Sequence, residues 1–79
     1  MFLIICYAVH HRTVASVDKR ETLEDACDFL KKDAKHVYAE EIESCDVDPN
    51  DVTLKIRDYK AIVEAYNGEF CWTWEILEE

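Results

Sequence analysis

Residues 59–77, YKAIVEAYNGEFCWTWEIL, predict a β-hairpin closed by Asn67-Gly68. Asn-Gly is the preferred pair for a two-residue type I′ turn, in which both positions need a positive φ angle. A two-residue turn also fixes which residues lie opposite each other. Every second opposing pair is then apolar: Tyr59/Ile76, Ala61/Trp74, Val63/Trp72 and Ala65/Phe70. Because two strands alone are only marginally stable in water, another part of the chain must cover this apolar face.

A helix that begins at Leu23 is the expected cover. Thr22 is its predicted N-cap, and acidic residues follow in the first turn, where the helix dipole favours negative charge. Continuing the helix at about 100° per residue puts Glu41 among its apolar residues, so the helix either ends near Glu40 or runs past the edge of the sheet. The apolar residues at helical spacing are Leu23, Ala26, Cys27, Leu30, Ala34, Val37 and Tyr38.

The remaining segments have the composition of strands. Residues 2–9 are a continuous apolar run, which is typical of a strand buried on both faces, and residues 13–18 alternate as a return strand would. Residues 52–56 also alternate, and a tight turn at Asp58-Tyr59 leads from them into the hairpin.

An alternative for this region is a second helix, capped by Pro49-Asn50-Asp51 and running to Tyr66. The β-branched content of residues 52–56 and the Asn-Gly hairpin favour strands. We therefore predict a single α+β domain over residues 1–79, of order ββαβββ. It has a mainly antiparallel sheet and one long helix packed on one face.

The charge of the chain limits its partners. Eighteen Asp and Glu residues against nine Lys and Arg residues give a formal net charge of −9 over 79 residues. This charge repels nucleic acid and anionic membranes, and it attracts basic partners over about 8 Å at physiological salt. The apolar N-terminal run lacks a preceding basic segment and is too short to span a bilayer, so no export signal is predicted. The four cysteines are interpreted as reduced thiols of a cytoplasmic protein.

No group of residues indicates catalysis, a cofactor or a metal site. Asp46-x-Asp48-x-Asn50 imitates the start of a calcium loop, but Asp51 stands where that loop needs glycine and Arg57 where it needs glutamate. The histidines lack the spacing of zinc sites, and there is no glycine-rich phosphate loop. We therefore expect a protein without cofactor, metal or enzymatic activity.

Negative charge is concentrated in the middle of the chain. Neither Lys nor Arg occurs between His36 and Leu54. The glutamates of this region fall near the C-terminal end of the predicted helix, where the dipole disfavours anions, so the cluster costs stability. We interpret it as a surface that binds a basic protein, because complementary fields speed encounter and exclude other partners. Its residues are Glu40, Glu41, Glu43, Asp46, Asp48 and Asp51.

Two apolar features outside the predicted core are further candidate contacts. Phe29 falls about 140° from the centre of the helix's apolar stripe, among charged residues that include Asp33, which is typical of an interface anchor. The alternative is that Phe29 packs sideways on a loop. The second feature is the sheet face that one helix leaves uncovered, with Ile62, Tyr66 and one row of residues 2–9. Self-association to give a homodimer is the simplest way to cover it.

The sequence resembles small phage-encoded inhibitor proteins of the anti-CRISPR and anti-restriction type. The resemblance rests on size, charge and architecture, with TLEDACDFL opening the helix and YNGEFCWTWEI near the end of the chain, so it assigns no functional residue. It implies a non-catalytic protein, in the cytoplasm of a bacterial host, that occupies the basic nucleic-acid-binding groove of a defence enzyme. Two alternatives are a homodimeric structural or adaptor module and an antitoxin or immunity protein.

Overall fold

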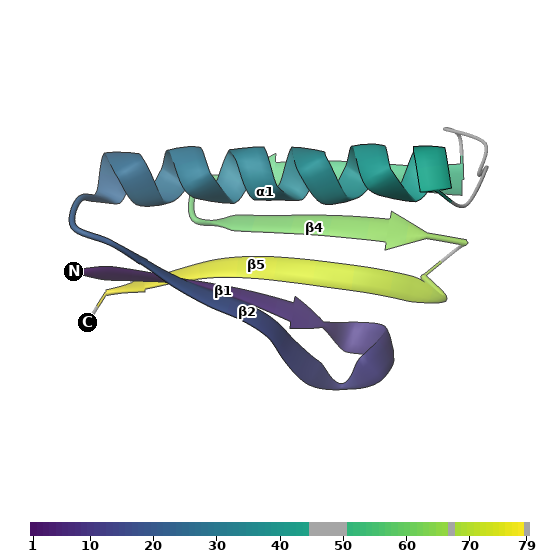
Figure 1. The fold of residues 1–79 in the computed structure, drawn as a ribbon, viewed down its shortest axis with the longest axis horizontal. Helices are drawn as coiled ribbons and strands as arrows, with labels where there is room; N and C mark the ends of the chain where they lie inside the picture. Colours follow the sequence, from purple (N-terminus) through teal and green to yellow (C-terminus); the bar gives the residue numbers. More distant parts are fainter. Residues whose placement is uncertain (45–50, 67, 79) are drawn as a thin grey trace.

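A computed structural model describes residues 1–44, 51–66 and 68–78. In this part of the chain, one α-helix covers one face of a five-stranded antiparallel sheet (Figure 1). The strand order is β2-β1-β5-β4-β3, which confirms the predicted α+β fold of order ββαβββ. The elements are β1 (Phe2–Ala8), the short 3-10 helix η1 (Val9–His11), β2 (Thr13–Arg20), α1 (Leu23–Ser44), β3 (Val52–Arg57), β4 (Lys60–Ala65) and β5 (Phe70–Glu78).

The predicted hairpin is formed by β4 and β5. Ala61 lies opposite Trp74, Val63 opposite Trp72 and Ala65 opposite Phe70, so the register read from the Asn-Gly turn is confirmed. At the turn, Gly68 has a φ angle of 92° and its N–H donates a hydrogen bond of 3.2 Å to the carbonyl oxygen of Ala65. Asn67, the other turn residue, lies outside the described residues.

Residues 52–65 form the two strands β3 and β4, so the alternative of a second helix is wrong. The strands are joined by the expected tight turn, in which Asp58 has a φ angle of 24°. β5 lies between β4 and β1, and it therefore connects the β3–β4 hairpin to the β1–β2 hairpin.

The two ends of α1 can be compared with the helix boundaries predicted from the sequence. The side-chain oxygen of Thr22 accepts a hydrogen bond of 3.1 Å from the N–H of Asp25, which confirms Thr22 as the N-cap. At the other end, α1 continues beyond Glu40 to Ser44, and Ile42 packs against the core while Glu41 is half-buried. Within the described part of the chain, no helix is both long enough and apolar enough to cross a membrane.

The core lies between α1 and the sheet. Alternate residues of each inner strand point toward the helix, as the period of two requires. Trp74, Ile4, Leu30 and Val63 are the largest side chains that are fully buried there. The opposite face of the sheet has no helix over it in the described residues (Figure 1), so its side chains are available to other molecules.

Candidate functional site

The acidic cluster predicted from the sequence lies in part around the C-terminal end of α1. Glu40 and Glu43 are exposed and stand about one helical turn apart, whereas Glu41 is half-buried. Asp51 is exposed and directly precedes β3. The end of α1 and the start of β3 lie at the same end of the molecule (Figure 1). Asp46 and Asp48 lie outside the described residues.

Little positive charge balances the end of α1. The last turn of the helix contains no basic residue, so its glutamates meet the negative end of the helix dipole. The Nε2 atom of His36 lies 3.5 Å from Oε1 of Glu40, and both side chains are exposed. An exposed pair of this kind contributes little to stability, and it is an ion pair only when the imidazole is protonated. The helix end therefore keeps an exposed negative surface.

Phe29 lies at the edge of α1 that faces β2. Its side chain is half-buried and packs partly against the core, and the guanidinium carbon of Arg20 lies 4.5 Å from the centre of its ring. This distance is typical of a cation–π contact. This placement matches the sideways packing considered above, except that the ring packs against β2 and not against a loop. Packing within the fold therefore explains why an aromatic residue stands at this position.

Asp33 was expected on the surface beside Phe29, and this expectation is wrong. Its side chain is half-buried, and Oδ2 accepts a hydrogen bond of 2.9 Å from the indole Nε1 of Trp74. The sequence signal for this contact is Trp74 itself, because a buried indole N–H needs an acceptor.

Cys6 lies near this hydrogen bond in the core. Its burial, and secondly the negative charge of Asp33, raise the pKa of the Cys6 thiol to about 11, although a hydrogen bond with Ser16 acts in the other direction. Cys6, Cys27 and Cys71 are free thiols, and Cys45 lies outside the described residues. A thiol with a raised pKa is a poor nucleophile and a poor metal ligand, so Cys6 is a core residue.

His10 performs a structural role that the sequence analysis missed. Its Nδ1 lies 3.2 Å from the backbone nitrogen of Cys71 and 3.0 Å from the carbonyl oxygen of the same residue. The ring also contacts Trp72, with 4.7 Å between ring centres. The imidazole thus continues the β1–β5 pairing beyond Ala8. Among the described residues, no three His, Cys, Asp or Glu side chains are grouped as a metal would require.

The uncovered face of the sheet, here called the open face, has an apolar half on β2 and β1. Val14 and Val17 are about half exposed, at 51% and 53%. The strand register places the following residues on this half: Leu3, Ile5, Tyr7, Val14, Val17 and Leu77. This half is larger than predicted from the sequence, because the two β2 valines also belong to it.

Two residues named for self-association are placed differently from each other. Ile62 lies on the open face and is half-buried. Tyr66 has a φ angle of 54°, which breaks the strand alternation, and its ring lies against Phe70 with 5.4 Å between centres. Phe70 packs partly against the core, and Tyr66 is exposed beside it. Self-association through Ile62 and Tyr66 stays a prediction.

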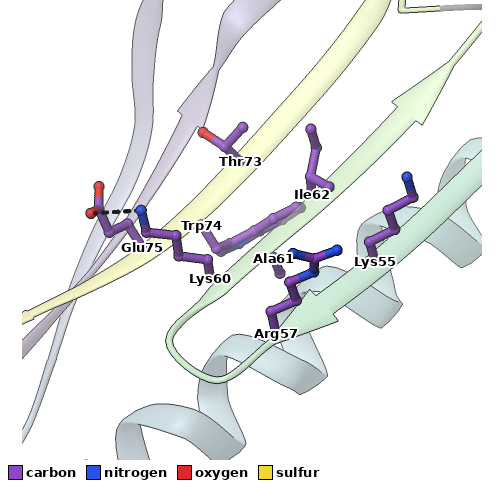
Figure 2. A pocket seen from close by; sticks show the side chains of 8 residues that line it. All are labelled: Lys55, Arg57, Lys60, Ala61, Ile62, Thr73, Trp74 and Glu75. Atoms are coloured by element: carbon purple, nitrogen blue, oxygen red, sulfur yellow. Dashed lines mark ion pairs between the residues drawn. The ribbon is translucent and has the colours of Figure 1, made fainter.

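The other half of the open face carries a group of basic side chains, here called the cationic corner. Its members are Lys55 and Arg57 of β3 and Lys60 of β4. They line a shallow cavity of about 420 Å³ (Figure 2). The Nζ atom of Lys60 lies 3.8 Å from Oε1 of Glu75, which stands opposite it on β5.

The open face differs in charge from the rest of the chain. The open face carries four basic residues and two acidic ones, a net charge of +2: Lys19, Lys55, Arg57, Lys60, Glu64 and Glu75. Because the whole chain carries −9, the remaining residues together carry −11. Of the described elements, α1 carries a net charge of −4, from seven acidic and three basic residues.

Comparison with protein-family models, with curated proteins and with solved structures found no match to this chain. Its function is therefore inferred from the chemistry of its surfaces.

Proposed function

We propose that this chain is a non-catalytic binding protein whose acidic helix side engages the basic surface of another protein. The observation that supports the proposal is the separation of charge, with +2 on the open face and −11 on the rest of the chain. A charge kept only for solubility is expected to be spread over all surfaces. Opposite signs on the open face and on α1, which carries −4, favour one orientation of the molecule as it approaches a charged partner.

The partner surface that fits best is a groove that normally holds nucleic acid. Exposed acidic groups three residues apart on a helix, such as Glu40 and Glu43, are about 4.5 Å from each other along the helix axis. A nucleic-acid strand presents one phosphate per ~3.4 Å of duplex, which is a similar density of negative charge. These glutamates and Asp51 would pair with the Lys and Arg residues that bind phosphates. The protein would then inhibit by occlusion, as the resemblance to phage-encoded inhibitors of bacterial defence enzymes implies.

The test compares two variants with the same change in net charge. Glu40→Lys/Glu43→Lys/Asp51→Lys reverses the acidic end of α1. The control, Glu21→Lys/Glu69→Lys/Glu78→Lys, reverses three exposed acidic residues elsewhere. Proteins retained from a bacterial lysate at low and at high salt are identified by mass spectrometry. Each purified candidate is then assayed for displacement of labelled nucleic acid by the wild-type chain and both variants.

We expect binding by wild type and control, weakening as salt rises, and loss of both binding and displacement in the first variant. Equal binding by both variants, or binding that does not change with salt, would contradict the proposal. Retention of a toxin with no nucleic-acid-binding surface would favour the immunity-protein alternative.

A homodimeric adaptor is the second candidate function, and the apolar half of the open face supports it. Val14 and Val17 are about half exposed and adjoin the half-buried Leu3, Ile5 and Tyr7. A contiguous apolar patch of this kind is typical of an interaction surface. Sedimentation of the wild type and of Val14→Lys/Val17→Lys decides the question. A dimer is expected only for the wild type, and a monomeric wild type at micromolar concentration would contradict this candidate.

A further inference from the structure

Two basic residues stand directly opposite each other at the cationic corner. Arg57 of β3 is paired in register with Lys60 of β4, and Lys55 lies two residues before Arg57 on the same face of β3. Like charges on directly opposite strand residues destabilise a sheet. The chain has 18 acidic residues and only nine basic ones, yet three of the nine are gathered here. This arrangement is unfavourable unless a negative charge lies among the three side chains.

The protein itself supplies little of that negative charge. Among the described residues, Glu75 is the one carboxylate that lines the cavity, and its ion pair with Lys60 is long, at 3.8 Å, and exposed. Neither Lys55 nor Arg57 makes a hydrogen bond or ion pair with any residue in the ranges 1–44, 51–66 and 68–78. The corner therefore carries a net charge of +2.

The cavity between these side chains has the size and lining of a small-molecule site. Its volume, about 420 Å³, falls within the range of roughly 300–1,000 Å³ that is typical of such sites. The side chain of Ile62 supplies apolar surface, and the hydroxyl group of Thr73 supplies a neutral hydrogen-bond donor. Trp74 also borders the cavity, but it is only 1% exposed and its side chain belongs to the core. Figure 2 shows the side chains of Lys60, Arg57 and Lys55 near those of Ile62 and Thr73. The combination offers an anion site with an apolar surface beside it.

We propose that the cationic corner binds a small phosphate monoester that carries an apolar group. A phosphate monoester has a charge of about −1.5 to −2 at pH 7, which matches the net +2 of the corner. The planar guanidinium of Arg57 binds two phosphate oxygens at once, and the two lysines add point charges. The apolar group lies against Ile62. The bound phosphate removes the repulsion between Arg57 and Lys60.

Phenyl phosphate is the probe, with inorganic phosphate and succinate as comparisons, in a titration followed by amide NMR spectra. We expect saturable shifts confined to β3, β4 and the adjoining part of β5, with phenyl phosphate the tightest of the three. Arg57→Gln should weaken its binding about tenfold, the size expected for a lost charge-assisted bidentate contact. Lys35→Gln, the same charge change at an exposed position of α1, should leave it unchanged. Ile62→Ser should weaken phenyl phosphate and leave inorganic phosphate unaffected.

Three results would overturn the proposal. Binding of phenyl phosphate to Arg57→Gln with wild-type affinity would exclude the corner as the site, and so would shifts that follow the lysines of α1. Inorganic phosphate or succinate binding as tightly as phenyl phosphate would exclude this ligand class. Lys55→Gln serves as the second variant, with the same expected loss, if Arg57→Gln does not give the spectrum of a folded protein.

Discussion

The indole Nε1 of Trp74 donates a hydrogen bond of 2.9 Å to Oδ2 of Asp33, and this bond links β5 to the middle of α1. Trp74 is 1% exposed, so its N–H has no access to bulk water. Asp33→Ala removes the acceptor and should lower the free energy of unfolding by about 1–3 kcal/mol, the cost of a buried polar group left without a partner. Asp33→Asn keeps an acceptor oxygen and should lose less. Urea denaturation measures both changes, and an alanine variant as stable as wild type would contradict the role of this bond.

The thiol of Cys6 should make stability depend on pH in alkaline solution. Its pKa is about 11 in the folded protein, against an ordinary value of 9.0. The neutral thiol is thus favoured by the fold, and the corresponding stability is fully present below pH 9 and lost as the pH rises from 9 to 11. The loss should be at most about 3 kcal/mol, since one pKa unit corresponds to about 1.4 kcal/mol. Denaturation of wild type and Cys6→Ala at several pH values tests this, because the alanine variant should lack that part of the decline.

Reversing the charge at the C-terminal end of α1 should stabilise the protein. Glu43→Lys places a cation at the negative end of the helix dipole and should raise the free energy of unfolding by about 0.3–1 kcal/mol. Glu24→Lys is the matched control in the first turn, where the dipole has the opposite sign, and it should destabilise the protein. Thermal denaturation compares the two. If both variants shift in the same direction, net charge and not the dipole is responsible.

His10 should protect one backbone amide of β5. His10→Phe keeps a ring against Trp72 but loses the Nδ1 atom, so the N–H of Cys71 should exchange with solvent faster, and stability should fall by about 0.5–1.5 kcal/mol. His10→Ala loses the ring contacts as well and should cost more. His11→Ala is the control. It removes an exposed ring that lies 4.2 Å from the ring of His10, but it leaves Nδ1 of His10 in place. Unchanged exchange of the Cys71 amide in His10→Phe would show that the hydrogen bond is not made in solution.

Gly68 should be needed for its backbone conformation alone. It has a φ angle of 92°, and a Cβ atom at this position would meet no atom within 4 Å. Gly68→Ala should therefore destabilise the hairpin by about 1–2 kcal/mol through the left-handed backbone. Gly68→Asn should cost less, because asparagine tolerates this region better. Equal stability of all three proteins in urea denaturation would mean that the turn relaxes to another conformation.

Local patterns in the sequence were sufficient for most of the fold. The alternation of apolar residues on either side of Asn67-Gly68 fixes a register in which a one-residue slip would expose Trp74, so the β4–β5 pairing could be predicted. The cap at Thr22 depends on residues within one turn, and it too was predictable.

Contacts between distant segments were not predictable in the same way. Asp33 lies beside the apolar stripe of α1, so the helical pattern alone does not show whether its side chain is exposed. That depends on how far the sheet extends below the helix, and the structure shows the position half-buried. His10 and Cys71 are 61 positions apart in the chain. Part of the cationic corner could be predicted from the sequence, because the alternation in β3 already placed Lys55 and Arg57 away from the core. Their proximity to Lys60 required the pairing across the Asp58-Tyr59 turn.

The position of β5 has a consequence for how the protein is made. β5 follows the other four strands in the chain, yet it is the strand through which the β1–β2 and β3–β4 hairpins are hydrogen-bonded into one sheet. On the ribosome, the native sheet therefore cannot assemble until residues 70–78 have left the exit tunnel. A nascent chain stalled before Phe70 would hold two separate hairpins beside the uncovered apolar stripe of α1, which is the kind of surface that chaperones bind.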